Sequence, residues 1–393
     1  RRPRCGNRLS PTPLVRPPND VQKNMSIEFK SEEMTINMGP HHPSTHGVLR
    51  LIVKIDGEVI RHVEPVIGYL HRSIERLAQD RNYFMYFPVV DRVDYVSIIA
   101  AEWPMVMAVE KIGGIEVPER AEYIRVITAE LTRIMSHLFW LGTFMLDLGS
   151  TTVIMYALRE REKIVDLMEE LTGQRMMFNY LRYGGVNADV PEGWLQKVKG
   201  FCDYFLRMID EYEILINKNP IFISRVKDIG IIPKEMVSKY GACGPILRGS
   251  GVKYDVRKDE PYSVYDRFDF DIPVGEKGDT FDRYVVRMEE MRQSVRILKQ
   301  AVDQIPPGPC LKKKLSFSFK IPAGDAYCQV EAPRGNMGVY LMSNGTNTAA
   351  RVKYRTPSYA NMQILPHVLK DAFLSDIMAI FGSFDVILPE VDR

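Results

Sequence analysis

Apolar residues recur at steps of three and four along several long stretches of the chain. The first stretch covers residues 118–148, and its apolar positions are Ile124, Ile127, Leu131, Ile134, Leu138, Leu141, Met145 and Leu148. The same spacing runs through residues 194–215 and 284–305, and residues 151–173 form a further helical stretch that ends at a glycine cap. One apolar stripe per helix indicates packing against a shared core. Near-heptad spacing over several turns favours antiparallel neighbours in one bundle.

Shorter segments with β-branched residues and turn signals lie near both ends of the chain. Residues 48–63 predict a hairpin around an Asp-Gly turn, and residues 326–343 predict a second hairpin around a Pro-Arg-Gly turn. The whole pattern predicts the α+β class, mainly α, with a large helical bundle and small antiparallel β pieces near both ends.

The remaining segments give weaker patterns. Short helices are expected at 69–79 and 95–111, and a last helix at 361–381, which Pro366 kinks or opens. Residues 218–278 are expected to hold short extended pieces and glycine turns. Changes in pattern divide the chain into five parts: an extended N-terminal arm that could be the remnant of a targeting segment (1–33), a β region with a histidine loop (34–68), a helical bundle (69–310), a β hairpin region (311–360), and a C-terminal helix and tail (361–393).

Composition excludes several classes of protein. The chain has 393 residues and a formal net charge of +2, so it lacks the basic field of a polyanion-binding protein. No run of about 18 apolar residues predicts a membrane span. Residues 1–19 carry five arginines and no acidic residue. That composition is typical of an organellar targeting segment and equally of a disordered arm.

The cysteines do not form a metal site by themselves. Five are present, and no two of them stand two or three residues apart, so the spacings of zinc and iron–sulfur ligands are missing. The nucleotide, phosphate, metalloprotease and hydrolase motifs GxGxxG, Walker A, HExxH and GxSxG are missing too. If this protein handles electrons through a metal cluster, a partner must hold the cluster.

A stiff loop, Met38–Gly47, holds three of the seven histidines, namely His41, His42 and His46. Its prolines and glycines restrict and bend the backbone ahead of the first hairpin. Imidazole titrates near neutral pH and binds metals. The loop is therefore a tight turn with solvated histidines, a proton donor that needs a buried partner, or a zinc site. Pro43 disfavours a helix here, which weakens the zinc interpretation.

Two polar residues are candidates to meet this loop. Tyr95 is expected to open a helix, and its phenol can donate a hydrogen bond at neutral pH; the alternative is a packed tyrosine with a wet hydroxyl. Asp147 ends the long apolar stripe, as a solvated end residue or as the buried partner of an imidazole. His137, within the same stripe, is expected to be a satisfied core histidine.

Long ordered motifs identify a family. They are GPHHPSTHGVLRL (39–51), GYLHRSIERL (68–77), DRVDYVS (91–97), RAEYIRVITAELTRI (120–134), FMLDLGSTT (144–152), LRYGGVNADVP (181–191), LRGSGVKYDVRKDEPYSVYD (247–266), YCQVEAPRGNMGVYLMS (327–343) and EVDR (390–393). Over residues 34–393 the chain resembles the quinone-site core subunit (49-kDa, NuoD-type) of respiratory complex I. That family is similar in fold to the large subunit of nickel–iron hydrogenases, whose metal needs two CxxC pairs. This chain has neither pair, so the hydrogenase interpretation fails.

The resemblance implies roles for individual residues. His46 and Tyr95 match the pair that hydrogen-bonds the two quinone carbonyls, Asp147 matches the carboxylate paired with that histidine, and His42 is a candidate to support the quinone site indirectly. Arg72 matches an arginine beside the terminal 4Fe–4S cluster of a neighbouring subunit. Met177 stands near that cluster, where many respiratory members have a histidine. Since Met177 cannot titrate, we expect a cluster potential that does not change over the physiological pH range.

The resemblance also implies an activity, cofactors and partners. The expected activity is that of an H⁺-translocating NADH:ubiquinone reductase, with ubiquinone as substrate, no cofactor bound by this chain alone, and NAD and FMN elsewhere in the complex. Expected partners are a cluster-bearing PSST-type subunit, a 30-kDa-type subunit, a ferredoxin-like TYKY-type subunit and a membrane-arm ND1-type subunit. The expected location is the matrix side of the mitochondrial inner membrane, with the bacterial plasma membrane or the thylakoid as alternatives. The alternative functions are a ferredoxin:plastoquinone oxidoreductase subunit and a scaffold that only supports a cluster subunit.

Overall fold

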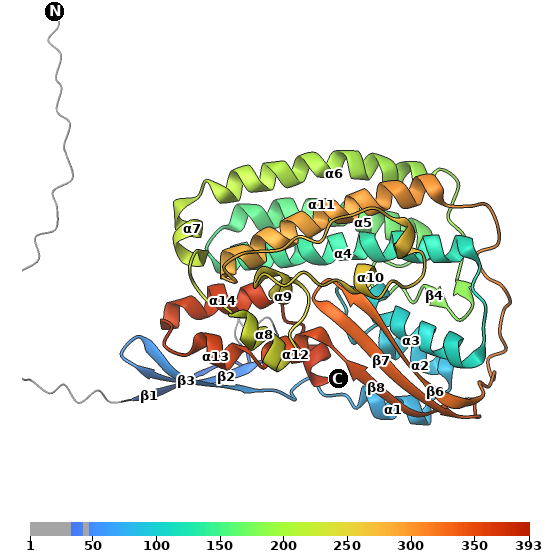
Figure 1. Ribbon diagram of the computed structural model, residues 1–393, viewed down its shortest axis with the longest axis horizontal. Coiled ribbons are helices and arrows are strands. Elements are labelled where there is room, and N and C mark those ends of the chain that lie inside the picture. Colours follow the sequence, from blue (N-terminus) through green and yellow to red (C-terminus); the bar gives the residue numbers. More distant parts are fainter. Residues whose placement is uncertain (1–32, 42–46) are drawn as a thin grey trace, which may run out of the picture.

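Long helices form one layer of the molecule. The computed structural model describes residues 33–41 and 47–393. In this part of the chain the long helices are α4 (Glu119–Asp147), α5 (Thr151–Thr172), α6 (Trp194–Asn217) and α11 (Thr280–Gln304). They lie side by side at the top of Figure 1, with α4 packed on α5 and on α11. The predicted helices are confirmed to within a few residues, and so is the mainly α, α+β class.

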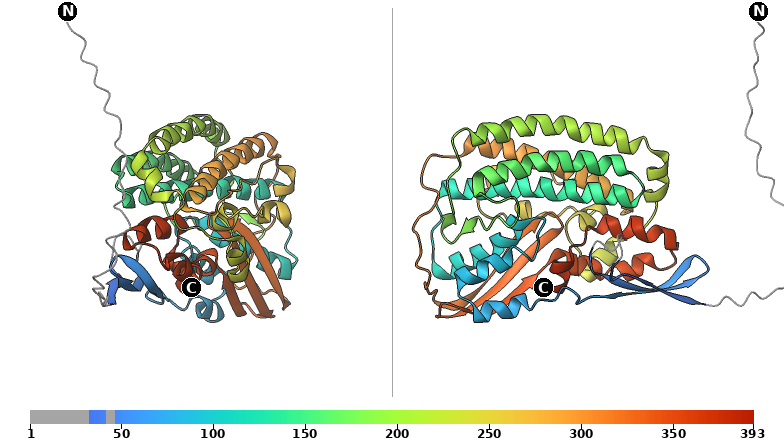
Figure 2. Two further views of the ribbon diagram at one scale, coloured as in Figure 1. Left: turned by 60° about the vertical axis from the view of Figure 1, so that its left-hand side comes forward. Right: turned by 180° about the vertical axis from the view of Figure 1, so that it is seen from behind.

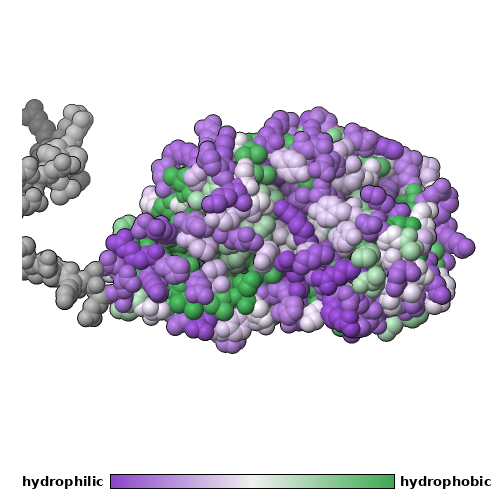
Figure 3. All heavy atoms as spheres, turned by 60° about the horizontal axis from the view of Figure 1, so that its bottom comes forward, coloured by the Kyte–Doolittle hydropathy of each residue, from purple (hydrophilic) through white to green (hydrophobic). Residues whose placement is uncertain are grey.

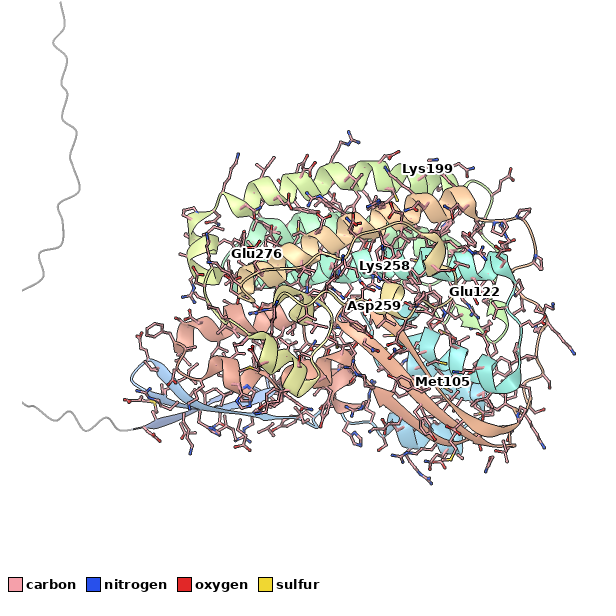
Figure 4. All side chains as sticks on the ribbon, viewed as in Figure 1. Met105, Glu122, Lys199, Lys258, Asp259 and Glu276 are labelled. Carbon is pink, nitrogen blue, oxygen red and sulfur yellow. The ribbon has the colours of Figure 1, made fainter. Side chains whose placement is uncertain are left out.

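A twisted antiparallel sheet lies below the bundle. It consists of β6 (Ala323–Ala332), β7 (Gly335–Asn344) and β8 (Ala349–Arg355) in that order. Helices α1 (Ile74–Asp80), α2 (Tyr83–Val90) and α3 (Ile98–Gly113) accompany the sheet. Met105 of α3 lies behind the strands (Figure 4) and is fully buried. The predicted second hairpin is confirmed as β6 and β7, whereas β8 was not predicted.

A second sheet and the C-terminal helices form the other end of the lower layer (Figure 2). The sheet contains β1 (Met34–Met38), β2 (Arg50–Asp56) and β3 (Val59–Val66). The predicted first hairpin is confirmed as β2 and β3, and β1 adds an edge strand. Its apolar face forms a separate core with the C-terminal helices. On the face in Figure 3, hydrophobic side chains gather on the half of the molecule that carries this sheet.

The prediction of extended pieces in residues 218–278 is wrong. The structure has short helices there, α7 (Pro220–Val226), α8 (Lys234–Tyr240), α9 (Pro245–Gly249), α10 (Val256–Asp259) and the 3₁₀ turn η3 (Tyr265–Arg267). Prolines start several of them, because a missing backbone donor costs nothing in a first helical turn. A small ladder of β4 (Leu181–Arg182) and β5 (Gly185–Val186) precedes α6.

The prediction of one C-terminal helix over 361–381 is also wrong. This region contains α12 (Pro357–Met362), α13 (Leu365–Leu369), the 3₁₀ turn η4 (Leu374–Asp376), α14 (Ile377–Phe384) and α15 (Leu388–Asp392). Pro366 lies in the first turn of α13, so it opens a helix and does not kink one. Asp371 and Asp385 adopt the left-handed conformation, with φ of 64° and 54°, which interrupts helical backbone.

Two predicted helices begin later than expected. Helix α1 begins at Ile74 and not at residue 69, after Ser73 with its positive φ of 54°. Helix α3 begins at Ile98 and not at Tyr95, because the Asp94 carboxylate accepts hydrogen bonds from the backbone of Val96 and Ser97, at 3.1 and 3.0 Å. Tyr95 therefore lies on a bend ahead of α3, where its side chain is free of the helix surface.

Candidate active site

A cavity of about 310 Å³ lies where the C-terminal end of α4 meets the chain ahead of α3 and the chain after α14. Its lining residues are Gly47, Tyr95, Phe139, Thr143, Leu146, Asp147, Asp385, Val386 and Ile387. The volume is at the lower end of the range for small-molecule sites. Most of the wall is apolar, and the polar groups come from separate elements, which is the arrangement that orients a flat ligand.

Tyr95 presents a neutral phenol to this cavity. Its side chain is half-buried, and burial raises the pKa of Tyr95, with the nearby Arg334 lowering it in part. The phenol therefore keeps its proton at neutral pH and can donate a hydrogen bond.

Asp147 is the last residue of α4 and is half-buried. Gly382 of α14 lets that helix approach closely, since a Cβ atom there would lie 3.0 Å from the Phe144 ring and 3.8 Å from Asp147 Oδ2. A carboxylate at a helix C-terminus meets the negative end of the helix dipole. A cationic group in the cavity is therefore attracted to this end of α4.

A buried arginine lies behind the cavity. Arg334 is 1% exposed and contacts the carboxylates of Asp94, Asp385 (3.4 Å) and Glu390 (3.6 Å). It also donates to Ser136 Oγ at 3.0 Å. Burial alone would lower the pKa of Arg334, but the three carboxylates raise it, so the cation is permanent. Burial also raises the pKa of Glu390 to about 8, so this carboxyl can hold a proton near neutral pH.

The C-terminal residues hold this wall in place. Asp392 accepts hydrogen bonds from the backbone of Gly68 and Leu70, at 2.8 and 2.7 Å. The His71 ring hydrogen-bonds the Asp392 carbonyl at 2.7 Å. The motifs at 68–77 and 390–393, distant in sequence, therefore form one unit that positions residues 385–387.

Among the predicted site residues, Tyr95 and Asp147 line the same cavity. Gly47, which follows His46 in the chain, lines it too, whereas His42 and His46 lie outside the described residues. His41 is exposed. His137 is fully buried and contacts Glu290 at 3.0 Å, which confirms it as a core histidine.

A second, more polar pocket of about 330 Å³ lies nearby and includes Met177, Asp91, Arg92 and Arg182 in its lining. Arg72 donates a hydrogen bond to the backbone carbonyl of Arg92 at 3.0 Å. The structure therefore brings Arg72 and Met177 to one surface. The segment 91–97 joins the two sites, since it begins at the Met177 pocket and reaches the Tyr95 cavity.

Sequence patterns missed three site residues. Arg334 and Glu390 belong to motifs that identify the family, and Asp385 lies between those motifs, yet nothing in their spacing indicates a site. A useful signal would have been their type, because charged residues within apolar surroundings are buried only with partners.

Two features are missing from the described part of the chain. No group of His, Cys, Asp and Glu side chains in residues 33–41 and 47–393 has the arrangement of a metal site. Among the helices of those residues, none has the length and apolar character to cross a membrane.

Comparison with known proteins gives consistent matches. The family model described as "Respiratory-chain NADH dehydrogenase, 49 Kd subunit" matches residues 147–319 and 313–393. The chain is 50% identical over 364 residues to an NADH-quinone oxidoreductase subunit of Geobacillus kaustophilus, covering 93% of this chain and 99% of that protein. It is 51% identical to the corresponding subunit of Geobacillus thermodenitrificans and 48% identical to that of Bacillus anthracis, each over 93% of this chain and all of the relative.

Proposed function

Because the chain belongs to the family of the 49-kDa subunit of respiratory-chain NADH dehydrogenase and is a core subunit of that complex, we propose that the Tyr95 cavity binds the quinone head group. In this proposal the quinone is also reduced there. The observation that carries this proposal is the convergence of Tyr95, Asp147 and Gly47 on one cavity. The apolar wall suits a flat ring, and the polar groups suit its two carbonyl oxygens.

The chemistry follows from the charge that develops on the substrate. Reduction of a quinone to a quinol adds two electrons and two protons, and negative charge grows on both oxygens before they are protonated. A donor aimed at such an oxygen stabilises this charge. In this proposal Tyr95 supplies one donor and one proton, and His46, which the family resemblance pairs with Asp147, supplies the other. After Tyr95 has given up its proton, the positive charge of Arg334 behind the cavity stabilises the resulting phenolate.

Electrons would enter at the other pocket. In this proposal a partner protein holds a 4Fe–4S cluster against the surface formed by Arg72, Arg92 and Met177. Arg92 and Tyr95 are three residues apart, so their Cα atoms are at most roughly 11 Å apart. A cation near the cluster stabilises its reduced form. The same segment therefore offers a short path from the cluster to the quinone.

The wider assignment rests on the family. We propose NADH as the electron source and coupling of quinone reduction to proton translocation, with PSST-type, 30-kDa-type, TYKY-type and ND1-type partners. The Arg-rich residues 1–19 support the matrix face of the mitochondrial inner membrane, and the bacterial relatives support a plasma membrane as the alternative. Fractionation of the source cells, with NADH and reduced ferredoxin compared as donors to the purified complex, decides both points.

The proposal is tested in the assembled complex with Tyr95→Phe and His46→Ala. Loss of a positioned proton donor lowers a rate by about 10²–10⁴-fold, so NADH-driven quinone reduction should fall by that order. Electron transfer from NADH to an artificial acceptor should persist, because it does not use the cavity. Tyr254→Phe, which removes only a surface hydroxyl contact with Glu260, is the matched control. Unchanged quinone reduction in both site variants would refute the assignment and favour a scaffold.

A further inference from the structure

Two carboxyl groups meet without a cation beneath the Met177 pocket. Asp91 follows α2, Glu102 is in the second turn of α3, and both residues are 0% exposed. The two carboxyls lie within hydrogen-bonding reach of each other. Glu102 Oε2 accepts the backbone N–H of Leu181 at 2.9 Å. The backbone N–H of Asn179 is near Asp91 and favours its ionised form. In the described part of the chain, however, no donor makes a hydrogen bond of normal geometry to either Asp91 oxygen or to Glu102 Oε1.

The neighbouring arginines are engaged elsewhere. Arg182 donates to Asn179, at 2.6 Å to its backbone and 3.1 Å to its side chain. Arg125 pairs with Glu110 at 2.6 Å. Arg92 is exposed at the rim. Within the described residues, none of these three forms an ion pair with Asp91 or Glu102, so they act on the pair only through space.

We propose that Asp91 and Glu102 share one proton at neutral pH, and that this pair exchanges protons with water in the pocket that Asp91 lines. Two ionised carboxylates buried side by side would repel each other, and three of their four oxygens would lack a hydrogen bond of normal geometry within the described residues. One proton supplies the missing donor and removes one charge. The pocket that Asp91 lines has a volume of about 330 Å³ and room for on the order of ten waters, although both Asp91 oxygens are buried beneath its surface.

Burial gives the pair two separate titrations. It raises the pKa of Glu102 well above the ordinary range, and the neighbouring Asp91 raises it further. Burial raises the pKa of Asp91 to about 6, and Glu102, Arg92, the backbone N–H of Asn179 and Arg182 oppose the shift. The pair therefore carries one negative charge at neutral pH and none in more acidic solution. The carboxyl pair at the floor of the Met177 pocket therefore binds a second proton in acidic solution and loses its negative charge.

This inference deepens the proposed function in one respect. If a partner with an electron carrier docks at this pocket, as proposed above, the carrier is close to a constant negative charge at neutral pH, and that charge disappears in acid. The shared proton itself does not depend on that docking.

Infrared difference spectroscopy of the purified complex, titrated from about pH 8 to about pH 5 around the Asp91 value, tests the proposal. The wild-type complex should show the carbonyl stretch of a protonated carboxyl at neutral pH, shifted in heavy water. Asp91→Asn and Glu102→Gln should each remove this band, since the new amide donates in place of the proton. Asp189→Asn, at an exposed ion pair with Arg120, should leave it unchanged. A neutral-pH spectrum in which neither variant removes a band would overturn the proposal.

A second variant keeps the proposal testable if those two fail to assemble. Arg182 favours the ionised form of Asp91, so Arg182→Gln should move the midpoint of the acid titration to higher pH. A midpoint that stays in place would also overturn the proposal. Neither experiment uses quinone or NADH, so this result is independent of the quinone-site assignment.

Discussion

Asp91 and Asp94 stand three residues apart on one segment, are both fully buried, and are satisfied in opposite ways. Asp94 accepts backbone hydrogen bonds and contacts the permanent cation of Arg334 beside the Tyr95 cavity. Asp91 faces the carboxyl of Glu102 beneath the Met177 pocket. At the first site the fixed charge of Arg334 stabilises the Asp94 carboxylate. At the second site a shared proton stabilises the carboxyl pair of Asp91 and Glu102.

The difference shows that one short motif can serve two kinds of chemistry. The permanent cation of Arg334 and its contact with the Asp94 carboxylate give Tyr95 a fixed charged neighbourhood, which suits a donor that must keep its geometry through each turnover. A proton-sharing pair responds to pH. The chain around Tyr95 is thus built for positioning, and the chain around Asp91 is built for titration.

Arg334→Met would break the first site most strongly. The variant leaves the buried carboxylates of Asp94 and Asp385 without their cation, and breaking a buried ion pair costs about 3–5 kcal/mol. We expect the assembled complex to be lost or to melt at a much lower temperature. The control is Arg296→Met, whose 41%-exposed side chain pairs with surface aspartates, and which should cost at most about 1 kcal/mol. Equal melting temperatures for the two variants would contradict the importance of the network.

The same substitution at the two aspartates sharpens the comparison directly. Asp94→Asn removes a charge-assisted contact with Arg334 and should destabilise the protein by about 1.5–3 kcal/mol. Asp91→Asn replaces a shared proton with an amide donor and should change stability little. Resistance of this chain to protease in increasing denaturant, measured in the assembled complex, compares them. A greater loss in Asp91→Asn would reverse the account of the two sites.

Glu390 links the first site to pH. Burial raises its pKa from 4.5 to about 8, so below about pH 4.5 the carboxyl is neutral in both folded and unfolded chains. As the pH rises from 4.5 to about 8 the unfolded chain loses this proton and the folded chain keeps it. Folding stability therefore falls by at most about 1.4 kcal/mol per pH unit in that window and then stays level.

Melting temperatures of the complex across that window check this expectation. Glu390→Gln should flatten the decline, whereas Glu276→Gln, at an exposed loop position (Figure 4), should not. If the melting temperature of the wild type rises from pH 5 to pH 8, and Glu390→Gln shows the same rise, then Glu390 is ionised throughout this range and the expectation is wrong.

Met177 gives the smallest expected effect. Because it cannot titrate, the potential of a cluster docked at its pocket should be constant over the physiological pH range, with a change only where Asp91 takes up its proton. Met177→His should introduce a slope of up to roughly 60 mV per pH unit, and histidine tolerates the positive φ of 55° found there. Redox titration followed by electron paramagnetic resonance measures it. A wild-type slope at neutral pH would contradict the prediction.

The long helices were predictable because each is long enough to repeat its apolar stripe. Helix α4 begins directly after Pro118, and α5 ends at Gly173, as the cap signals predict. The short helices α7 to α10 were not predictable, because four to seven residues give no periodicity to distinguish them from turns. The C-terminal helix predicted over 361–381 was too long, since Asp371 within it adopts a left-handed conformation and donates its backbone N–H to the Ile60 carbonyl of β3 at 2.8 Å.

The site was predictable only in part. Tyr95 and Asp147 were candidates from their positions in the sequence, the family resemblance suggested their roles, and the structure brings both to one cavity. The contact between Arg334 and Asp94 joins residues 240 positions apart, which no local spacing encodes. Asp91 and Glu102 are closer in sequence, but they lie on either side of the bend ahead of α3, so helical periodicity does not predict that they meet. Long-range charge pairing must be read from the fold.

The central claim is that quinone binds in the Tyr95 cavity and not in the Met177 pocket. Photoaffinity labelling of the assembled complex with an azidoquinone, followed by peptide mapping, tests it most directly. The account predicts adducts on the cavity-lining segments 139–147 and 385–387, and their loss when excess quinone competes. Competable adducts on residues 172–187 around Met177, with none at the cavity, would contradict it.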